Sequence, residues 1–236
     1  MQVSRLYDAA LKLMNDWIKR YIEYRFPIIP LGRGSKCPVT RGWQNGSHPA
    51  DAFRNRNVGT RAGERVNVDG KEGFLLIVDF DSSDVNLLKQ LCATIPLTRT
   101  TCVRTGGEHR GYHLFYLTAF ETRKRGMLSY RGASVDLLGK GSFAVVPPSV
   151  VAEPYRYLVG LDELAFLSNE AYDSLLSTLL IWKQVDTLIK KVAAQKLTPV
   201  KAMQTLAGQN TTLEMVSYFQ HSLDQIGPID DGPAER

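Results

Sequence analysis

The strongest hydrophobic signal in the chain is a run of five apolar residues, 74–78, that ends at Asp79, Phe80 and Asp81. A run this short, rich in Leu, Ile and Val, predicts a buried β-strand that reaches the surface at its acidic end. Because side chains alternate across a strand, Asp79 and Asp81 should point the same way, with their carboxylates roughly 7 Å apart. Two like charges at that spacing repel each other, so the pattern predicts a divalent cation between them.

The same residues have a second interpretation. The segment continues as Ser82-Ser83-Asp84, and Asp and Ser both favour turns and helix N-caps. The two aspartates would then mark only the end of a strand and the start of a helix. The stretch alone leaves both interpretations open.

Patterning before this strand predicts an α/β arrangement. Residues 3–24 carry apolar side chains every three or four positions, as in an amphipathic helix, and residues 26–31 form a short apolar strand. The next segments are expected to be a short helix, a strand and a polar connection, at 48–54, 57–63 and 64–72. After Asp81, we expect Ser82 or Ser83 to cap a helix over residues 85–92, which Pro96 ends.

The middle of the chain is rich in strands. Short strands are expected at 100–104, 111–117 and 154–159. Segments 134–138 and 142–146 flank Gly139-Lys140-Gly141 and are interpreted as a hairpin with a glycine turn. Residues 122–126 are interpreted as a basic loop.

The last third is helical. We expect helices from residue 161 to 193, from Thr198-Pro199 onward, and over residues 213–226. The chain is therefore divided into a domain of residues 1–160 and a helical C-terminal region of residues 161–236. The pattern itself indicates only that these helices cover the sheet.

The charge, the cysteine spacing and the lack of long apolar segments exclude only a few classes of protein. The 236 residues hold 29 Lys and Arg against 24 Asp and Glu, a net charge of +5 that permits a polyanionic partner. The three cysteines, Cys37, Cys92 and Cys102, lack C-x-x-C spacing, which argues against a structural zinc site. No segment resembles a signal peptide or a membrane span, so a cytoplasmic protein without a membrane partner is expected.

Three carboxylates and one histidine are the candidate chemical groups. Asp136 lies on a later predicted strand and joins Asp79 and Asp81 as a set of oxygen ligands, which favours Mg²⁺ or Mn²⁺ over zinc. Such a site transfers phosphoryl or nucleotidyl groups. His113, on an alternating strand, is either structural or a hydrogen-bond donor to a triphosphate. The basic candidates for the same role, each of which is otherwise a solvated surface charge, are Lys36, Arg61, Arg104, Arg110 and Lys140.

Three short motifs resemble those of the archaeo-eukaryotic primase superfamily. V-D-F-D at 78–81, G-Y-H at 111–113 and V-D at 135–136 match its hydrophobic-D-x-D, small-x-H and hydrophobic-D patterns. The flanking segments resemble the bifunctional primase–polymerase (prim-pol) branch of this superfamily, which is found in mobile-element replication proteins, and they occur in the same order. These segments are Ile28-Ile29-Pro30, Lys36-Cys37-Pro38, Gly42-Trp43, Asn57-Val58-Gly59, Thr105-Gly106-Gly107 and Val145-Val146-Pro147-Pro148-Ser149. The resemblance covers about residues 26–150. The chain departs from the pattern at Glu108-His109-Arg110, which lengthens the segment before the histidine.

The resemblance implies a role for each matching residue. Asp79, Asp81 and Asp136 would hold two catalytic Mg²⁺ or Mn²⁺ ions, and His113 would contact the phosphates of the incoming nucleotide. Further nucleotide contacts are assigned to Lys36, Arg61, Thr105 and Lys140. The implied fold is an RRM-like mixed-sheet catalytic core with a smaller N-terminal α/β part and a helical C-terminal region. In relatives such helices help to bind the template or the initiating nucleotide, so here they either have this role or simply cover the sheet.

The implied activity is DNA primase and DNA polymerase, with NTPs or dNTPs joined on a single-stranded DNA template during replication of a plasmid, phage or other mobile element. A helicase or other replication proteins are expected partners. Two alternatives from other classes are a non-catalytic nucleic-acid-binding replication-initiator module and a metal-dependent nuclease. The chain is either a self-contained primase–polymerase or the front of a longer replication protein.

Overall fold

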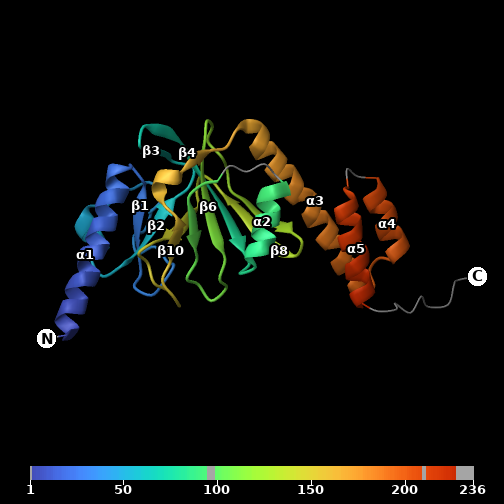
Figure 1. The fold of residues 1–236 in the computed structure, drawn as a ribbon, viewed down its shortest axis with the longest axis horizontal. Helices are drawn as coiled ribbons and strands as arrows, with labels where there is room; N and C mark the ends of the chain where they lie inside the picture. Colours follow the sequence, from blue (N-terminus) through green and yellow to red (C-terminus); the bar gives the residue numbers. More distant parts are fainter. Residues whose placement is uncertain (1, 95–98, 209–210, 227–236) are drawn as a thin grey trace, which may run out of the picture. The chain divides into compact units, whose positions relative to one another are not determined.

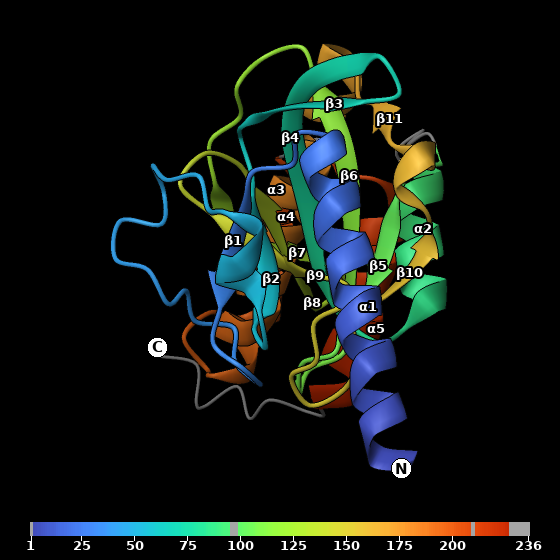
Figure 2. The same cartoon turned by 90° about the vertical axis from the view of Figure 1, so that its left-hand side faces the viewer.

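A computed structural model describes residues 2–94, 99–208 and 211–226 as an α+β protein (Figures 1 and 2). The expected fold class is thereby confirmed. The chain forms two compact units, one of residues 1–126 and 135–173 and the other of residues 127–134 and 174–236. The functional boundary expected at residue 160 stays a prediction, because compactness alone does not define a domain's activity.

The helices (α), short 3₁₀ helices (η) and strands (β) in the described residues follow one another along the chain. In order they are α1 (Gln2–Glu23), β1 (Ile28–Leu31), η1 (Ala50–Phe53), β2 (Asn57–Arg61), β3 (Arg65–Val68), β4 (Lys71–Asp81), α2 (Val85–Thr94), β5 (Cys102–Arg104), β6 (Tyr112–Thr118), β7 (Arg125–Tyr130), β8 (Ala133–Leu138), β9 (Phe143–Val146), β10 (Arg156–Val159), η2 (Leu161–Glu163), β11 (Ala165–Phe166), α3 (Asn169–Ala193), α4 (Pro199–Ala207) and α5 (Leu213–Ile226).

The larger sheet is built around β4. Its strand order is β10-β5-β6-β4-β8-β7, with β3 added to β4 and β11 added in parallel to β6. Residues 75–78 of β4 are completely buried, as expected of a strand that is covered on both faces. Leu75 and Ile77 belong to the main core, which also contains side chains of α1 and of a second sheet. The alternate residues face α2, which lies on the opposite side of this sheet (Figure 1).

The second sheet has three strands in the order β1-β2-β9. A buried serine holds it to the following segment: Ser149 Oγ accepts a hydrogen bond from Val58 N at 2.8 Å and donates one to Val58 O at 3.1 Å. Together with α1, this sheet packs on one face of the larger sheet through a continuous apolar core (Figure 2). The middle of β4 is therefore enclosed between the two sheets, whereas its last residue, Asp81, is exposed.

The second unit consists of a hairpin tip and helices. Arg131 and Gly132, both with positive φ, form the two-residue turn between β7 and β8. Buried Asp186 of α3 accepts hydrogen bonds from the Ser129 hydroxyl and from Gly132 N, the latter at 3.1 Å. Trp182, fully buried, packs edge-on against Tyr130 with ring centroids 5.3 Å apart. A buried carboxylate and an indole thus fix the turn to α3.

Most expected elements are present, including α1, the short β1, α2 and the helix that begins after Thr198, whose Oγ1 accepts from Lys201 N at 3.3 Å. The hairpin expected across Gly139-Lys140-Gly141 is wrong, because β8 lies in the larger sheet and β9 pairs with β2. Lys140 N instead donates to Thr122 O at 2.8 Å, so the glycine segment carries the chain from one sheet to the other.

Four smaller expectations need correction. Residues 64–72 were expected as a connection and 122–126 as a loop, but β3 and the start of β7 occupy parts of them. The cap of α2 is Asp84, whose Oδ1 accepts from Asn86 N and Leu87 N, rather than Ser82 or Ser83. The helix expected from residue 161 begins only at Asn169, after η2 and β11. Pro96 lies outside the described residues. Within those described, no helix has both the length and the apolar character needed to cross a lipid bilayer.

Replacing Asp186 with Ala should destabilise the second unit by about 1–3 kcal/mol, because Gly132 N and the Ser129 hydroxyl lose their buried acceptor. Urea unfolding followed by far-UV circular dichroism measures the change. The matched control is Asp173→Ala in the same helix, where the side chain is exposed and the effect should stay within about 0.5 kcal/mol. Equal stability of the two variants would contradict this role of Asp186.

Candidate active site

Strand alternation places the four expected catalytic residues on one face of the larger sheet. Asp79 and Asp81 share the face of Leu75 and Ile77, which belong to the core between the two sheets. On β6, His113 likewise shares the face of the core residue Phe115, and on β8, Asp136 shares the face of the core residue Leu138. The sequence alone could not establish this, because it did not show which face of each strand meets the core.

Asp79 and His113 form the centre of the site. They are directly opposite each other in the antiparallel β4–β6 pair, and His113 Nε2 lies 3.3 Å from Asp79 Oδ1. The His113 side chain is only 7% exposed, and its Nδ1 is buried without a hydrogen-bond partner among the described residues. The contact through Nε2 therefore holds the imidazole beside Asp79, whereas Nδ1 is enclosed within the protein.

Gly111 explains why a small residue precedes the histidine by two positions. A Cβ at this position would lie 2.2 Å from Phe80 O, so only glycine lets β6 approach β4 beside the two aspartates. The loop before it is closed by two hydrogen bonds: Gly111 N donates to Thr105 Oγ1 at 2.7 Å, and Thr105 N donates to Gly111 O at 3.0 Å. Backbone packing thus sets the position of His113.

The charges of the carboxylates are unequally balanced. Burial would raise the pKa of Asp79, but His113, Lys36 and Lys124 outweigh it and lower that pKa. The pKa of Asp81 is raised by partial burial and by the negative charges of Asp79 and Asp136, which exceed the effect of the nearby cations. Asp81 therefore carries a negative charge that the protein itself does not fully neutralise.

The donor chemistry fits a hard divalent cation. Asp79, Asp81 and Asp136 offer carboxylate oxygens, the ligands of Mg²⁺ and Mn²⁺, and the pKa of Asp81 is raised first by burial and then by the charges of the other two aspartates. In the conformation of the described residues, no three His, Cys, Asp or Glu side chains are yet arranged as a ligand set. Lys124 Nζ lies 3.5 Å from Asp136 Oδ2. A cation of the protein thus stands beside one of the expected ligands.

The other expected nucleotide-binding residues are distributed unevenly. Lys36 lowers the pKa of Asp79 and extends toward Gly107, where an added Cβ would meet its Nζ at 2.8 Å. Thr105 is buried and closes the loop described above. The remaining candidates have other partners: Arg61 donates to Gln44 O and Lys140 pairs with Glu121.

Of the two further arginines suggested by the sequence, Arg110 pairs with Glu153. Arg104 lies in β5 beside core residue Val103, so alternation directs it to the sheet face opposite His113. Lys36 is thus the expected basic residue that the structure places with the carboxylates, whereas these two arginines are directed elsewhere.

Two residues near the carboxylates were not expected from the sequence. Lys124 belongs to the basic segment 122–126, whose charge was the available signal. Tyr155 is buried, with its ring centroid 6.2 Å from that of His113, and its pKa is raised to about 12 by burial and by Asp79 and Asp81. No sequence pattern marked Tyr155 as a site residue, since it precedes the edge strand β10 and lies far along the chain from His113.

Comparison with known families agrees with this geometry. The fold and the site define an α+β domain with an acidic centre on one sheet face, and residues 18–169 match the model of the bifunctional DNA primase/polymerase, N-terminal domain. The chain belongs to this primase/polymerase family, and the resemblance inferred from its motifs is confirmed. Family membership implies DNA and nucleotides as substrates. No curated protein matches the chain.

The unequal charges predict opposite effects of two isosteric substitutions at neutral pH with chelator present. Asp79→Asn should lower the free energy of unfolding by about 1 kcal/mol, because the ionised carboxylate is favoured by the cations around it. Asp81→Asn should raise it by less than about 1 kcal/mol, since the repelled charge is partly screened by solvent. Denaturant unfolding of both variants beside wild type measures the two signs.

The pH dependence follows from the two shifts. The pKa of Asp81 is raised in the folded protein, so its ionised carboxylate destabilises the fold. This destabilisation is absent below the unfolded-state pKa of about 4 and develops as the pH rises from there through the folded-state pKa. The lowered pKa of Asp79 makes its stabilisation present above about pH 4, and the stabilisation is lost as pH falls through the folded value. A destabilised Asp81→Asn variant at pH 7 would refute this account of the site.

Proposed function

We propose that the protein is a DNA primase and DNA polymerase that joins NTPs or dNTPs on a single-stranded DNA template. The observation that carries the proposal is the gathering of Asp79, Asp81, Asp136 and His113 on one sheet face, with Lys36 and Lys124 beside them. Replication of a plasmid, phage or other mobile element is the expected setting, with a helicase or other replication proteins as partners.

The proposed reaction is attack of a 3′-hydroxyl on the α-phosphate of a bound nucleotide, with pyrophosphate as the leaving group. Asp79, Asp81 and Asp136 would hold two Mg²⁺ or Mn²⁺ ions, which stabilise charge on the phosphate oxygens and favour ionisation of the hydroxyl. The protein supplies no covalent nucleophile. Its residues position the substrates, and positioning and electrostatics account for most of such a rate enhancement.

The basic residues would act on the triphosphate. Lys36 and Lys124 come from separate loops and both lower the pKa of Asp79, so their charges act on the region where phosphates would bind. His113 lies 3.3 Å from Asp79 through Nε2 and would orient that carboxylate. Its proposed contact with the nucleotide phosphates is supported by membership of the primase/polymerase family. These contacts would offset part of the cost of bringing three negative groups to an already acidic face.

A strand-synthesis assay tests the proposal. The protein is incubated with a single-stranded DNA template, labelled nucleotides and Mg²⁺ or Mn²⁺, with and without an annealed primer. We expect synthesis in both cases, and a decrease of more than about a hundredfold in Asp79→Asn/Asp81→Asn, because the proposed metal ligands are removed. The matched control is Asp51→Asn/Asp173→Asn, which removes the same charge from exposed positions.

The outcomes separate the candidate functions. Extension of a primer without synthesis from nucleotides alone would make the protein a polymerase only. Cleavage of the template would support a nuclease, and DNA binding without any synthesis under either metal would leave a binding module. Synthesis that is unchanged in the Asp79→Asn/Asp81→Asn variant would refute the assigned catalytic centre.

Thermal unfolding gives a second readout. A nucleoside triphosphate with Mn²⁺ should raise the melting temperature, because a ligand that binds only the folded state stabilises it increasingly as its concentration exceeds Kd. The increase should disappear in Asp79→Asn/Asp81→Asn and persist in Asp51→Asn/Asp173→Asn. A nuclease has no need to bind free triphosphate, so an unchanged melting temperature would argue against nucleotide transfer.

A further inference from the structure

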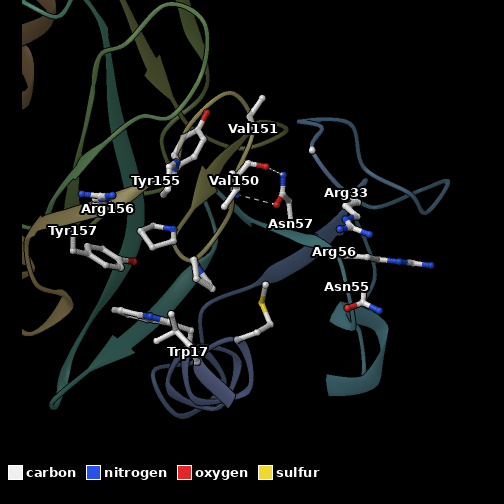
Figure 3. A pocket seen from close by; sticks show the side chains of 16 residues that line it. Trp17, Arg33, Asn55, Arg56, Asn57, Val150, Val151, Tyr155, Arg156 and Tyr157 are labelled. Atoms are coloured by element: carbon white, nitrogen blue, oxygen red, sulfur yellow. Dashed lines mark hydrogen bonds between the residues drawn. The ribbon is translucent and has the colours of Figure 1, made fainter. Parts of the chain in front are cut away.

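The first unit contains a groove with a volume of ≈ 840 Å³ that the reaction described above does not use. It lies between α1, the loop after β1 and residues 147–157, and we name it the α1 groove (Figure 3). Trp17 and Tyr157 lie on one side and Arg33 and Arg56 on the other, and Tyr155 also lines the groove (Figure 3). Most of its lining is apolar, which is unusual for an open surface of this size.

The apolar side of the α1 groove is preformed. The rings of Trp17 and Tyr157 stack with centroids 5.0 Å apart, and the Tyr157 hydroxyl is 2.8 Å from that of Tyr21. Asn57 fixes the neighbouring wall: its Nδ2 donates to Val150 O at 2.8 Å, and its Oδ1 accepts from Val150 N at 3.0 Å. A ligand would therefore meet fixed walls and lose little affinity to their ordering.

The opposite rim is positively charged. Arg33 and Arg56 are exposed, neither forms an ion pair with a described carboxylate, and no aspartate or glutamate among the described residues lines the groove. An apolar wall facing two uncompensated guanidinium groups matches a ligand with one apolar and one anionic side. A strand of nucleic acid with unpaired bases has this character.

The α1 groove adjoins the catalytic carboxylates at two points. Tyr155 lines the groove, and its ring centroid lies 6.2 Å from that of His113, which contacts Asp79, so the same side chain borders both sites. The loop after β1 is the second connection, since Arg33 lines the groove while Lys36 lowers the pKa of Asp79. A strand in the groove would therefore run toward the site of nucleotide transfer.

We propose that the α1 groove binds the unpaired template strand next to the active site, with its bases against the wall of Trp17, Val150 and Tyr157 and its phosphates on Arg33 and Arg56. This inference rests on the proposed polymerase function for the identity of the strand. The template is favoured over the primer because primer bases are paired in the product duplex and cannot pack on an apolar wall. Only unpaired bases expose the faces that this groove accommodates.

Binding of a fluorescein-labelled oligothymidylate, measured by anisotropy across a salt series, tests the charged rim. Arg33→Gln/Arg56→Gln should weaken binding and reduce the slope of log K against log salt by up to about 1.4, or about 0.7 for each single-strand phosphate that the protein no longer neutralises. The matched control is Arg41→Gln/Arg54→Gln, which removes the same charge from exposed positions outside the groove and should leave the slope unchanged.

The apolar wall has its own test. Val150→Glu should weaken oligothymidylate binding about tenfold, whereas Val39→Glu should not, although the two valines are 46% and 44% exposed. Oligonucleotide binding should also quench tryptophan fluorescence in the wild type and in Trp43→Phe, and quench it much less in Trp17→Phe. Both readouts are made without metal or nucleotide.

The results separate this inference from the proposed function. Binding and quenching that depend on Arg33, Arg56, Val150 and Trp17 would support the template groove even if the protein synthesises no DNA. If the protein synthesises DNA but Arg33→Gln/Arg56→Gln and Val150→Glu bind the oligothymidylate as tightly as the wild type, the template-binding role of the groove is refuted and the polymerase function is retained. Blunt duplex DNA that binds as tightly as the oligothymidylate, with the same sensitivity to the variants, would also overturn it.

Discussion

Asp79 and Asp81 lie at the end of β4, whose middle is fully buried, and balancing their charge is the constraint on which the rest of the site depends. The four residues before Asp79 are fully buried, so this part of β4 offers no counter-charge of its own. His113 comes from β6, Lys36 from the loop after β1 and Lys124 from the segment before β7. The site therefore exists only when elements separated widely in the sequence have packed together.

Close backbone approach is the second constraint, and it explains the glycines around the site. Gly111 lets β6 pass against Phe80 O, and Gly106 packs where a Cβ would lie only 1.9 Å from Glu153 O. Gly106 O also accepts hydrogen bonds from Ala152 N and Glu153 N, at 3.0 and 2.9 Å. These contacts dock the 105–111 loop on the segment that leads to Tyr155. The small residues of the motifs are thus requirements of main-chain packing, while the aspartates and histidine carry the chemistry.

The sequence predicted helices and strands well, but it predicted poorly which strands pair with each other, for a physical reason. Five apolar residues before Asp79 specify a buried strand through local patterning, and the cap and proline at Thr198-Pro199 specify a helix start. The pairing of β9 with β2 instead of β8 depends on contacts that no local pattern contains, and a glycine segment suits a crossing between sheets as well as a hairpin turn. Strand β3 was missed because its alternation is short and polar. Tyr155 was missed because its position near His113 arises from tertiary packing alone.

The acidic centre and the α1 groove make opposite physical demands, and the fold meets both by placing them on either side of one buried tyrosine. Phosphate chemistry requires exposed charge, which the strand ends provide where the core between the two sheets stops. Unpaired bases require an apolar surface, and a folded domain can keep one open only if rigid side chains maintain it, as the stacked Trp17 and Tyr157 do. Tyr155 separates the two environments: its ring belongs to the apolar core, and the negative charges of Asp79 and Asp81 reach its hydroxyl. Because Tyr155 is buried and its ring lies 6.2 Å from that of His113, a template strand bound as proposed would approach the carboxylates past a packed side chain, and such positioning favours nucleotide addition.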